Sequence, residues 1–197
     1  MKFFVIACCC MFLGIGLFLD VFEKILTLKF KEYGEGIHIV PILAMGSVFL
    51  GIYYNLSIWY KLTNRNLFGA GITIAGAIVT ILLNIWWIPY FGYTGSAWAT
   101  FSCYAFMMVT SYLFGQKMYP IPYAKKKLIS YLVLTTLIFF LHKGLGLLSG
   151  NIYFSITTAF ILLLAFLYFV ANIERKEFQQ FPVIGKFFGG QPNAKQL

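Results

Sequence analysis

The chain has 197 residues, of which 60% are apolar and only 11% are charged, and its mean hydropathy is +0.82. A water-soluble domain of this length needs far more charge to cover its surface, so the composition excludes an ordinary soluble fold. The apolar residues come in continuous runs and do not alternate with polar ones, which favours membrane-spanning helices over a β-barrel. The sequence therefore predicts an all-α, polytopic membrane protein.

The first apolar run, residues 3–26, is expected to be a retained span and not a cleaved signal, because no small-x-small cleavage site precedes Asp20. Three consecutive cysteines lie in this run, and a fourth, Cys103, lies in another. They show no CxxC or Cys/His spacing. We therefore expect no disulfide framework, no metal site and no cofactor.

Five further apolar runs follow, so that six spans are expected in a bundle covering residues 1–173. The six runs cover residues 3–26, 37–60, 67–89, 95–116, 128–148 and 152–173. The fifth run is the weakest, because His142 and Lys143 interrupt it. Residues 174–197 are expected to form a cytoplasmic tail that either lies on the membrane surface or is disordered.

Lysine and arginine are distributed unevenly over the predicted loops. With the N-terminus in the cytoplasm, eleven of the fifteen lie on the inner side, and the outer side holds Lys24, Lys29, Lys31 and Lys143. The positive-inside rule then places both termini in the cytoplasm. The net charge of +9 follows from this topology, and no basic patch for nucleic acid is present.

The two middle spans are joined by the stretch NIWWIPYFGYTGSAWAT, residues 84–100. Residues 89–95 are expected to form a tight hairpin on the outer side, because Pro89 does not continue a helix and Gly92 and Gly95 permit a sharp turn. The aromatic rings around this turn suit a membrane interface.

The run from Leu83 to Thr100 has the pattern LN-x-x-x-IP-x-x-G-x-x-G-[SA]-A-x-AT. This pattern resembles the Wzx-type oligosaccharide flippases of the multidrug/oligosaccharidyl-lipid/polysaccharide exporter superfamily. Residues 40–66 are similar to the tenth helix of that family and its inner loop, and residues 119–128 are similar to the inner loop before its thirteenth helix. The resemblance implies that this chain is part of the second lobe of a MATE-like flippase plus the terminal helix pair.

The resemblance implies a transporter that flips lipid-linked oligosaccharide across the cytoplasmic membrane by alternating access, for the synthesis of cell-surface polysaccharide. The implied partners are membrane lipid, the lipid-linked oligosaccharide and the missing N-terminal lobe. The alternative is a non-transporting truncated or accessory membrane subunit that packs against a partner lobe. An enzyme is not expected, because the six acidic residues form no DxD or His-x4-Asp constellation.

Uncharged polar residues within the predicted spans are candidates for lining a cavity. These residues are Asn55, Thr73, Thr80 and Asn84. The last three share one face of the third span at helical spacing, where polar residues either let helices pack closely or face a hydrated path.

Ionisable residues near the predicted membrane surfaces also have two interpretations each. Asp20 and Lys24, four residues apart, are candidates for a structural ion pair or for binding a coupling ion. His38 and His142 are expected at outer helix ends, either as interface residues or in proton coupling. Residues 125–127 are three lysines that either set the topology or attract an anionic lipid or a lipid diphosphate.

Overall fold

The structure is a computed structural model that describes residues 2–29, 36–118, 125–149 and 152–174. The regular elements of these residues are helices, which confirms the predicted all-α fold for this part of the chain. The α-helices are α1 (Lys2–Leu17), α2 (Leu19–Lys29), α3 (Val40–Leu56), α4 (Ile58–Leu62), α5 (Asn66–Met118), α6 (Lys125–Ser149) and α7 (Ile152–Ile173).

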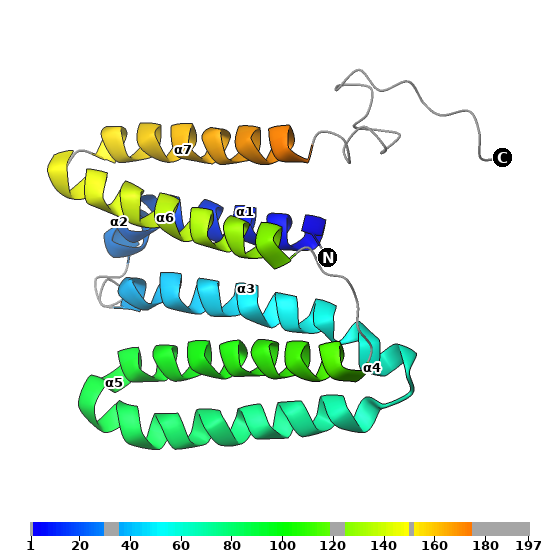
Figure 1. Cartoon of the computed structure of the whole chain (residues 1–197). Coiled ribbons are helices and arrows are strands. Elements are labelled where there is room, and N and C mark those ends of the chain that lie inside the picture. The colour runs from blue at the N-terminus through cyan, green and yellow to red at the C-terminus, as the bar shows by residue number, and fades with distance from the viewer. Residues whose placement is uncertain (1, 30–35, 119–124, 150–151, 175–197) are drawn as a thin grey trace, which may run out of the picture.

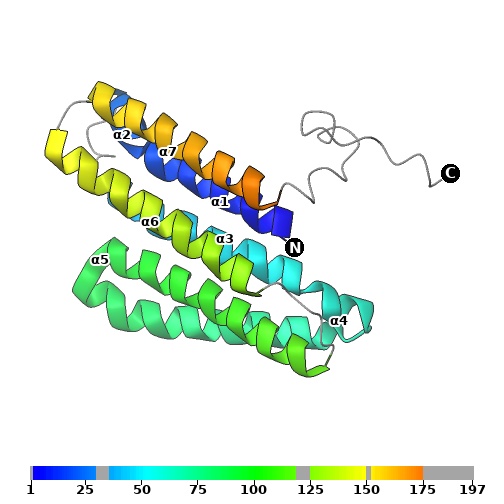
Figure 2. The ribbon, with the colours of Figure 1, turned by 45° about the horizontal axis from the view of Figure 1, so that its top comes forward.

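The long helices lie side by side, and α5 folds back on itself to form a hairpin (Figure 1). α5 packs chiefly on α3, α3 also packs on α1, and α1 packs on α6 and α7. The tilted view keeps α5 on one side of α3 and the α1, α6 and α7 helices on the other (Figure 2). The main buried core lies between α1, α3, α6 and α7, and includes Leu13, Val48, Tyr131 and Phe166.

Four stretches of the described chain are helical, long and apolar enough to cross a membrane, and the bent pair of α1 and α2 makes a possible fifth. Large apolar side chains cover the outside of these helices, and the exposed fraction reaches 87% at Leu67. Apolar patches of this extent are rare on soluble monomers, whereas lipid covers them in a membrane. These features together indicate a multi-pass membrane protein.

The prediction of a single span over 3–26 implied one straight helix, but the first apolar run forms two. The helix breaks at Phe18, and α1 and α2 are bent by 49° relative to one another. The carbonyl oxygen of Phe18 accepts hydrogen bonds from the amides of both Val21 and Phe22 at 3.1 Å. The bend places the polar residues that begin with Asp20 on a separate helix, away from the apolar axis of α1.

The second predicted span, residues 37–60, lies within one apolar helical stretch, Gly36–Leu62, that is interrupted at Ser57. α3 ends at Leu56 and the five-residue α4 begins at Ile58. At the junction, the hydroxyl of Ser57 donates a hydrogen bond to the carbonyl oxygen of Tyr54 at 2.6 Å. A serine hydroxyl bonded to its own backbone is a known cause of local helix bending.

The turn between the third and fourth predicted spans is made at Gly92, within the predicted hairpin 89–95. The helix continues through Pro89, and the backbone leaves helical geometry at Gly92, with φ 56° and ψ −137°. This conformation is readily adopted only by glycine, which explains why the reversal occurs there. Gly95 packs against the backbone of Trp87, where an added Cβ would lie 2.7 Å from the carbonyl oxygen.

The last two helices follow the predicted runs closely. α6 passes through His142 and Lys143 without a break, and α7 has the limits expected for the span 152–173. Of the predicted tail, only Glu174 belongs to the described residues; positions 175–197 lie outside them. The orientation with cytoplasmic termini also predicts that residues 27–36 and 143–151 lie on the outer side, and parts of these two segments lie outside the described residues.

Candidate functional site

Two of the predicted cavity residues, Thr73 and Thr80, lie on the first limb of α5 and bond back to their own helix. The hydroxyl of Thr73 donates to the carbonyl oxygen of Gly69 at 2.9 Å, and that of Thr80 donates to Gly76 at 3.0 Å. Thr73 also lies 3.3 Å from the hydroxyl of Tyr53 on α3. Bonds of this kind satisfy a threonine hydroxyl without water.

The face that carries these threonines packs closely against the second limb of α5. At Gly76 an added Cβ would lie 2.8 Å from the side chain of Met107. The thiol of Cys103, on the same limb as Met107, donates to the carbonyl oxygen of Gly76 at 3.2 Å. Gly76, at the centre of this face, therefore allows close approach of the two limbs. Close packing is the first of the two roles expected for the face.

Asn84, further along the same limb, is half-buried, and its side-chain Oδ1 is buried without a hydrogen-bond partner. A buried carbonyl group that loses its partner costs about 1–3 kcal/mol. Asn55, the remaining candidate, is half-buried on α3. Of these two, Asn84 stands out, because a buried unsatisfied amide oxygen calls for a physical explanation.

A groove of about 340 Å³ opens between the two limbs of α5. It lies near the first residues of the helix, which follow α4, and near its last residues, which end at Met118. Its lining is almost entirely apolar and consists of Leu67, Phe68, Gly71, Ile72, Ala75, Thr110 and Phe114. None of the four predicted cavity residues lines this groove.

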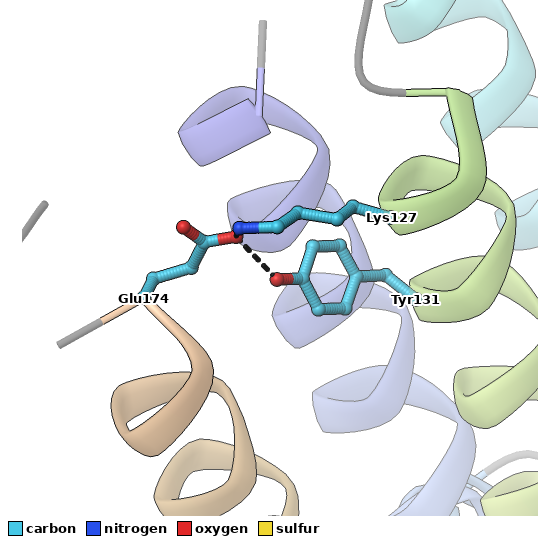
Figure 3. Close-up of polar contacts among 3 residues, drawn as sticks. All are labelled: Lys127, Tyr131 and Glu174. Atoms are coloured by element: carbon cyan, nitrogen blue, oxygen red, sulfur yellow. Dashed lines mark hydrogen bonds and ion pairs between the residues drawn. The ribbon is translucent and has the colours of Figure 1, made fainter. Parts of the chain in front are cut away.

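A charged cluster joins the start of α6 to the end of α7 (Figure 3). One carboxylate oxygen of Glu174, Oε1, accepts hydrogen bonds from Lys127 at 2.9 Å and from Tyr131 at 2.6 Å. Glu174 and Tyr131 are each only 1% exposed, whereas the side chain of Lys127 is 41% exposed. The second oxygen, Oε2, is buried without a hydrogen-bond partner.

Opposing effects act on the pKa of Glu174. Burial raises it, but the hydrogen bonds from Tyr131 and Lys127 and the charges of Lys127 and Lys2 outweigh burial, so the pKa lies below its usual value. The carboxylate therefore stays ionised and holds the start of α6 and the end of α7 together. Sequence reasoning missed this role because it placed Glu174 in the tail; the signal was an acidic residue at the end of an apolar run, opposite the lysines at 125–127.

A second polar cluster lies at the other end of the same helices. The hydroxyl of Ser155, near the start of α7, donates to Oδ2 of Asp20 on α2 at 2.6 Å. Nε2 of His142, on α6, lies 3.2 Å from the carbonyl oxygen of Ser155 and 3.4 Å from its hydroxyl. His142 is 4% exposed and packs inside the bundle, while its depth relative to a membrane stays a prediction. The Asp20–Lys24 ion pair stays a prediction.

No family model, curated protein or solved structure matches this chain. The arrangement of the described residues therefore carries the functional argument. No group of three or more His, Cys, Asp and Glu side chains within residues 2–29, 36–118, 125–149 and 152–174 is placed to hold a metal ion. The described residues contain two separate polar clusters that connect helices. They also contain an unsatisfied amide oxygen on α5.

Proposed function

We propose that this chain is a six-span protein of the cytoplasmic membrane, with both termini in the cytoplasm, and that it forms part of a transporter of lipid-linked oligosaccharide. In this proposal α5, at 53 residues and about 80 Å of helix, supplies two crossings of a hydrocarbon core of about 30 Å. α1, α3, α6 and α7 supply the other four. The resemblance of residues 83–100 to the flippases supports the substrate class.

The observation that carries the proposal is the amide of Asn84. A rigid membrane bundle gains nothing from burying an unpaired amide oxygen, because a leucine of similar volume would pack there without the cost. A transporter that alternates between two arrangements has a use for it. The amide that lacks a partner in one arrangement gains one, from protein or from a sugar hydroxyl, in the other.

The proposed mechanism is alternating access without covalent chemistry. The hairpin of α5 moves with α3, on which it packs, relative to a partner lobe that completes the transport path. Thr73 and Thr80 keep their hydroxyls bonded within the helix during this motion. Asn84 is the residue that we expect to contact the glycan.

The test is a chromosomal Asn84→Leu substitution in the organism that makes this protein, with Ile85→Leu as the control on the adjacent, lipid-exposed position. We expect Asn84→Leu to reduce the lipid-linked oligosaccharide in the outer leaflet, at a normal level of the protein in the membrane. The control should export normally. Normal export by Asn84→Leu would remove this residue from the transport path.

Deletion of the whole chain separates the transporter from an accessory subunit. Loss of surface polysaccharide with accumulation of the lipid-linked precursor in the inner leaflet is the result expected for a flippase. Unchanged precursor levels in both leaflets would contradict the proposed function and leave a subunit that packs against a partner lobe.

A further inference from the structure

Three helices meet at the cluster formed by Asp20, His142 and Ser155. The hydroxyl of Ser155 on α7 lies 2.6 Å from the carboxylate of Asp20 on α2 and 3.4 Å from Nε2 of His142 on α6. α2 is bent by 49° relative to α1 at Phe18. Its position therefore depends on the contacts that its own residues make with the bundle. The bond to Asp20 connects α2 to the bundle.

The protons of the cluster can be assigned from the geometry. The carbonyl oxygen of Ser155 only accepts, and it already accepts a bond from the hydroxyl of Thr158 at 2.9 Å. The contact of 3.2 Å between this oxygen and Nε2 of His142 is favourable only if Nε2 carries a proton. Ser155 has a single hydroxyl proton, and the short distance to Asp20 assigns it to that carboxylate.

We propose that His142, Ser155 and Asp20 form a proton-binding latch that holds α2 against the bundle when His142 is protonated. A proton from water binds Nδ1, and no other bond changes. The imidazolium is a donor at both nitrogens, so it cannot accept the Ser155 proton, which then points to Asp20. Both hydrogen bonds of the chain from His142 to Asp20 then involve a charged group, which strengthens them.

The neutral state of His142 loosens the latch. A neutral imidazole has a second tautomer in which Nε2 is an acceptor, and the hydroxyl of Ser155 lies 3.4 Å from this nitrogen. When this proton turns to Nε2, Asp20 loses its donor on α7. The short α2 helix then lacks this bond to α7, so it gains freedom to move relative to the bundle.

The other described titratable groups near this end are few. α2 carries Glu23 and Lys24 beside Asp20, and α6 carries the exposed Lys143 next to His142. The last turns of α1 carry no charged side chain, and the first turns of α7 contribute Tyr153 as a titratable group. Asp20 is thus the carboxylate that the hydrogen-bond chain connects to His142.

The experiment measures the distance between spin labels on α2 and α7 in the full chain in lipid nanodiscs. Labels are attached to cysteines at the exposed positions Phe22 and Tyr168, in a background without the native cysteines. Distances are recorded at about pH 5.5 and about pH 8.5, because histidine is the side chain that most often changes charge within this range. We expect one narrow distance at acidic pH and a broadened or second distance at alkaline pH.

Three variants make the result specific. His142→Gln and Ser155→Ala should each lose the response to pH, and Ser155→Ala keeps the titrating histidine but lacks the linking hydroxyl. His38→Gln, at an exposed histidine before α3, should respond like the wild type. A pH-independent distance in the wild type, a response retained by Ser155→Ala, or a response lost in His38→Gln would each overturn the latch. Ser155→Ala decides the matter even if His142→Gln does not fold.

Discussion

At the scale of single residues, Glu174 shows how a carboxylate is kept charged in a nearly water-free place. Its burial favours the neutral acid, while two hydrogen bonds and a nearby lysine favour the anion. The balance has a consequence for stability, because removal of one partner from a buried charge usually costs more than the pair contributed.

We therefore expect Glu174→Gln to lower the free energy of unfolding by about 1.5–3 kcal/mol, the usual contribution of hydrogen bonds to charged groups. The measurement is thermal unfolding in nanodiscs, with Lys126→Gln as the control, because it removes a neighbouring exposed charge. An equal loss in the two variants would contradict a specific role for the Glu174 cluster.

The pH dependence of protein stability follows from the direction of the pKa shift of Glu174. Because folding lowers the pKa of Glu174, its stabilisation is fully present above the usual value of 4.5 and is lost as pH falls through the lower folded-state pKa. We expect wild-type stability to fall in that acidic range more steeply than that of Glu174→Gln. Parallel stability curves for the two proteins would show that Glu174 is not the group responsible.

At the scale of elements, the hairpin of α5 depends on two glycines for different reasons. Gly92 adopts a positive φ in open space, whereas Gly95 is helical but lies against the backbone of Trp87. Gly71, on the first limb, has open space where its Cβ would be and no unusual φ, so it provides a matched control.

We expect Gly95→Ala to destabilise the protein by about 1–3 kcal/mol through overpacking, and Gly92→Ala by about 1–2 kcal/mol through backbone strain. Gly71→Ala should instead be neutral or stabilising by up to about 1 kcal/mol, since it removes a glycine from a helix interior. Folded yield and thermal unfolding in detergent measure all three. If Gly71→Ala lowered stability as much as Gly95→Ala, the close approach at Trp87 would not be the cause of the destabilisation.

At the scale of the whole molecule, the hairpin tip and the α4–α5 connection lie at opposite ends of the helical array (Figure 1). If the helices cross a membrane, these two points lie on opposite sides of it. From the uneven distribution of lysine and arginine, we propose that the hairpin tip lies outside and the other connection in the cytoplasm.

This orientation predicts the reactivity of single cysteines in a background without the native four. In intact cells, Tyr93→Cys should react with a membrane-impermeant thiol reagent, and Asn66→Cys should react only after the cells are opened. Reaction at position 66 in intact cells, without reaction at position 93, would show that the orientation is the opposite of the one proposed. Both positions are exposed in the structure, so burial does not explain a difference between them.

The sequence alone determined that the chain is helical and apolar, and it located the residues of the hairpin and the limits of α7. These features depend on the composition and on neighbours within a few residues, which periodicity and turn chemistry report directly. The local pattern also contained the polar residues Asp20, His142 and Glu174, but it did not show which distant residues contact them.

Only the tertiary structure decided the bend at Phe18 and the partners of the buried polar groups. Ser155 and Asp20 are 135 positions apart, and Tyr131 and Glu174 are 43 apart, so no local pattern connects them. Their contacts arise because α1, α6 and α7 pack together, which brings the ends of distant helices to the same place. A polar side chain among apolar helices must find a partner there, and the packing of the helices determines which one it finds.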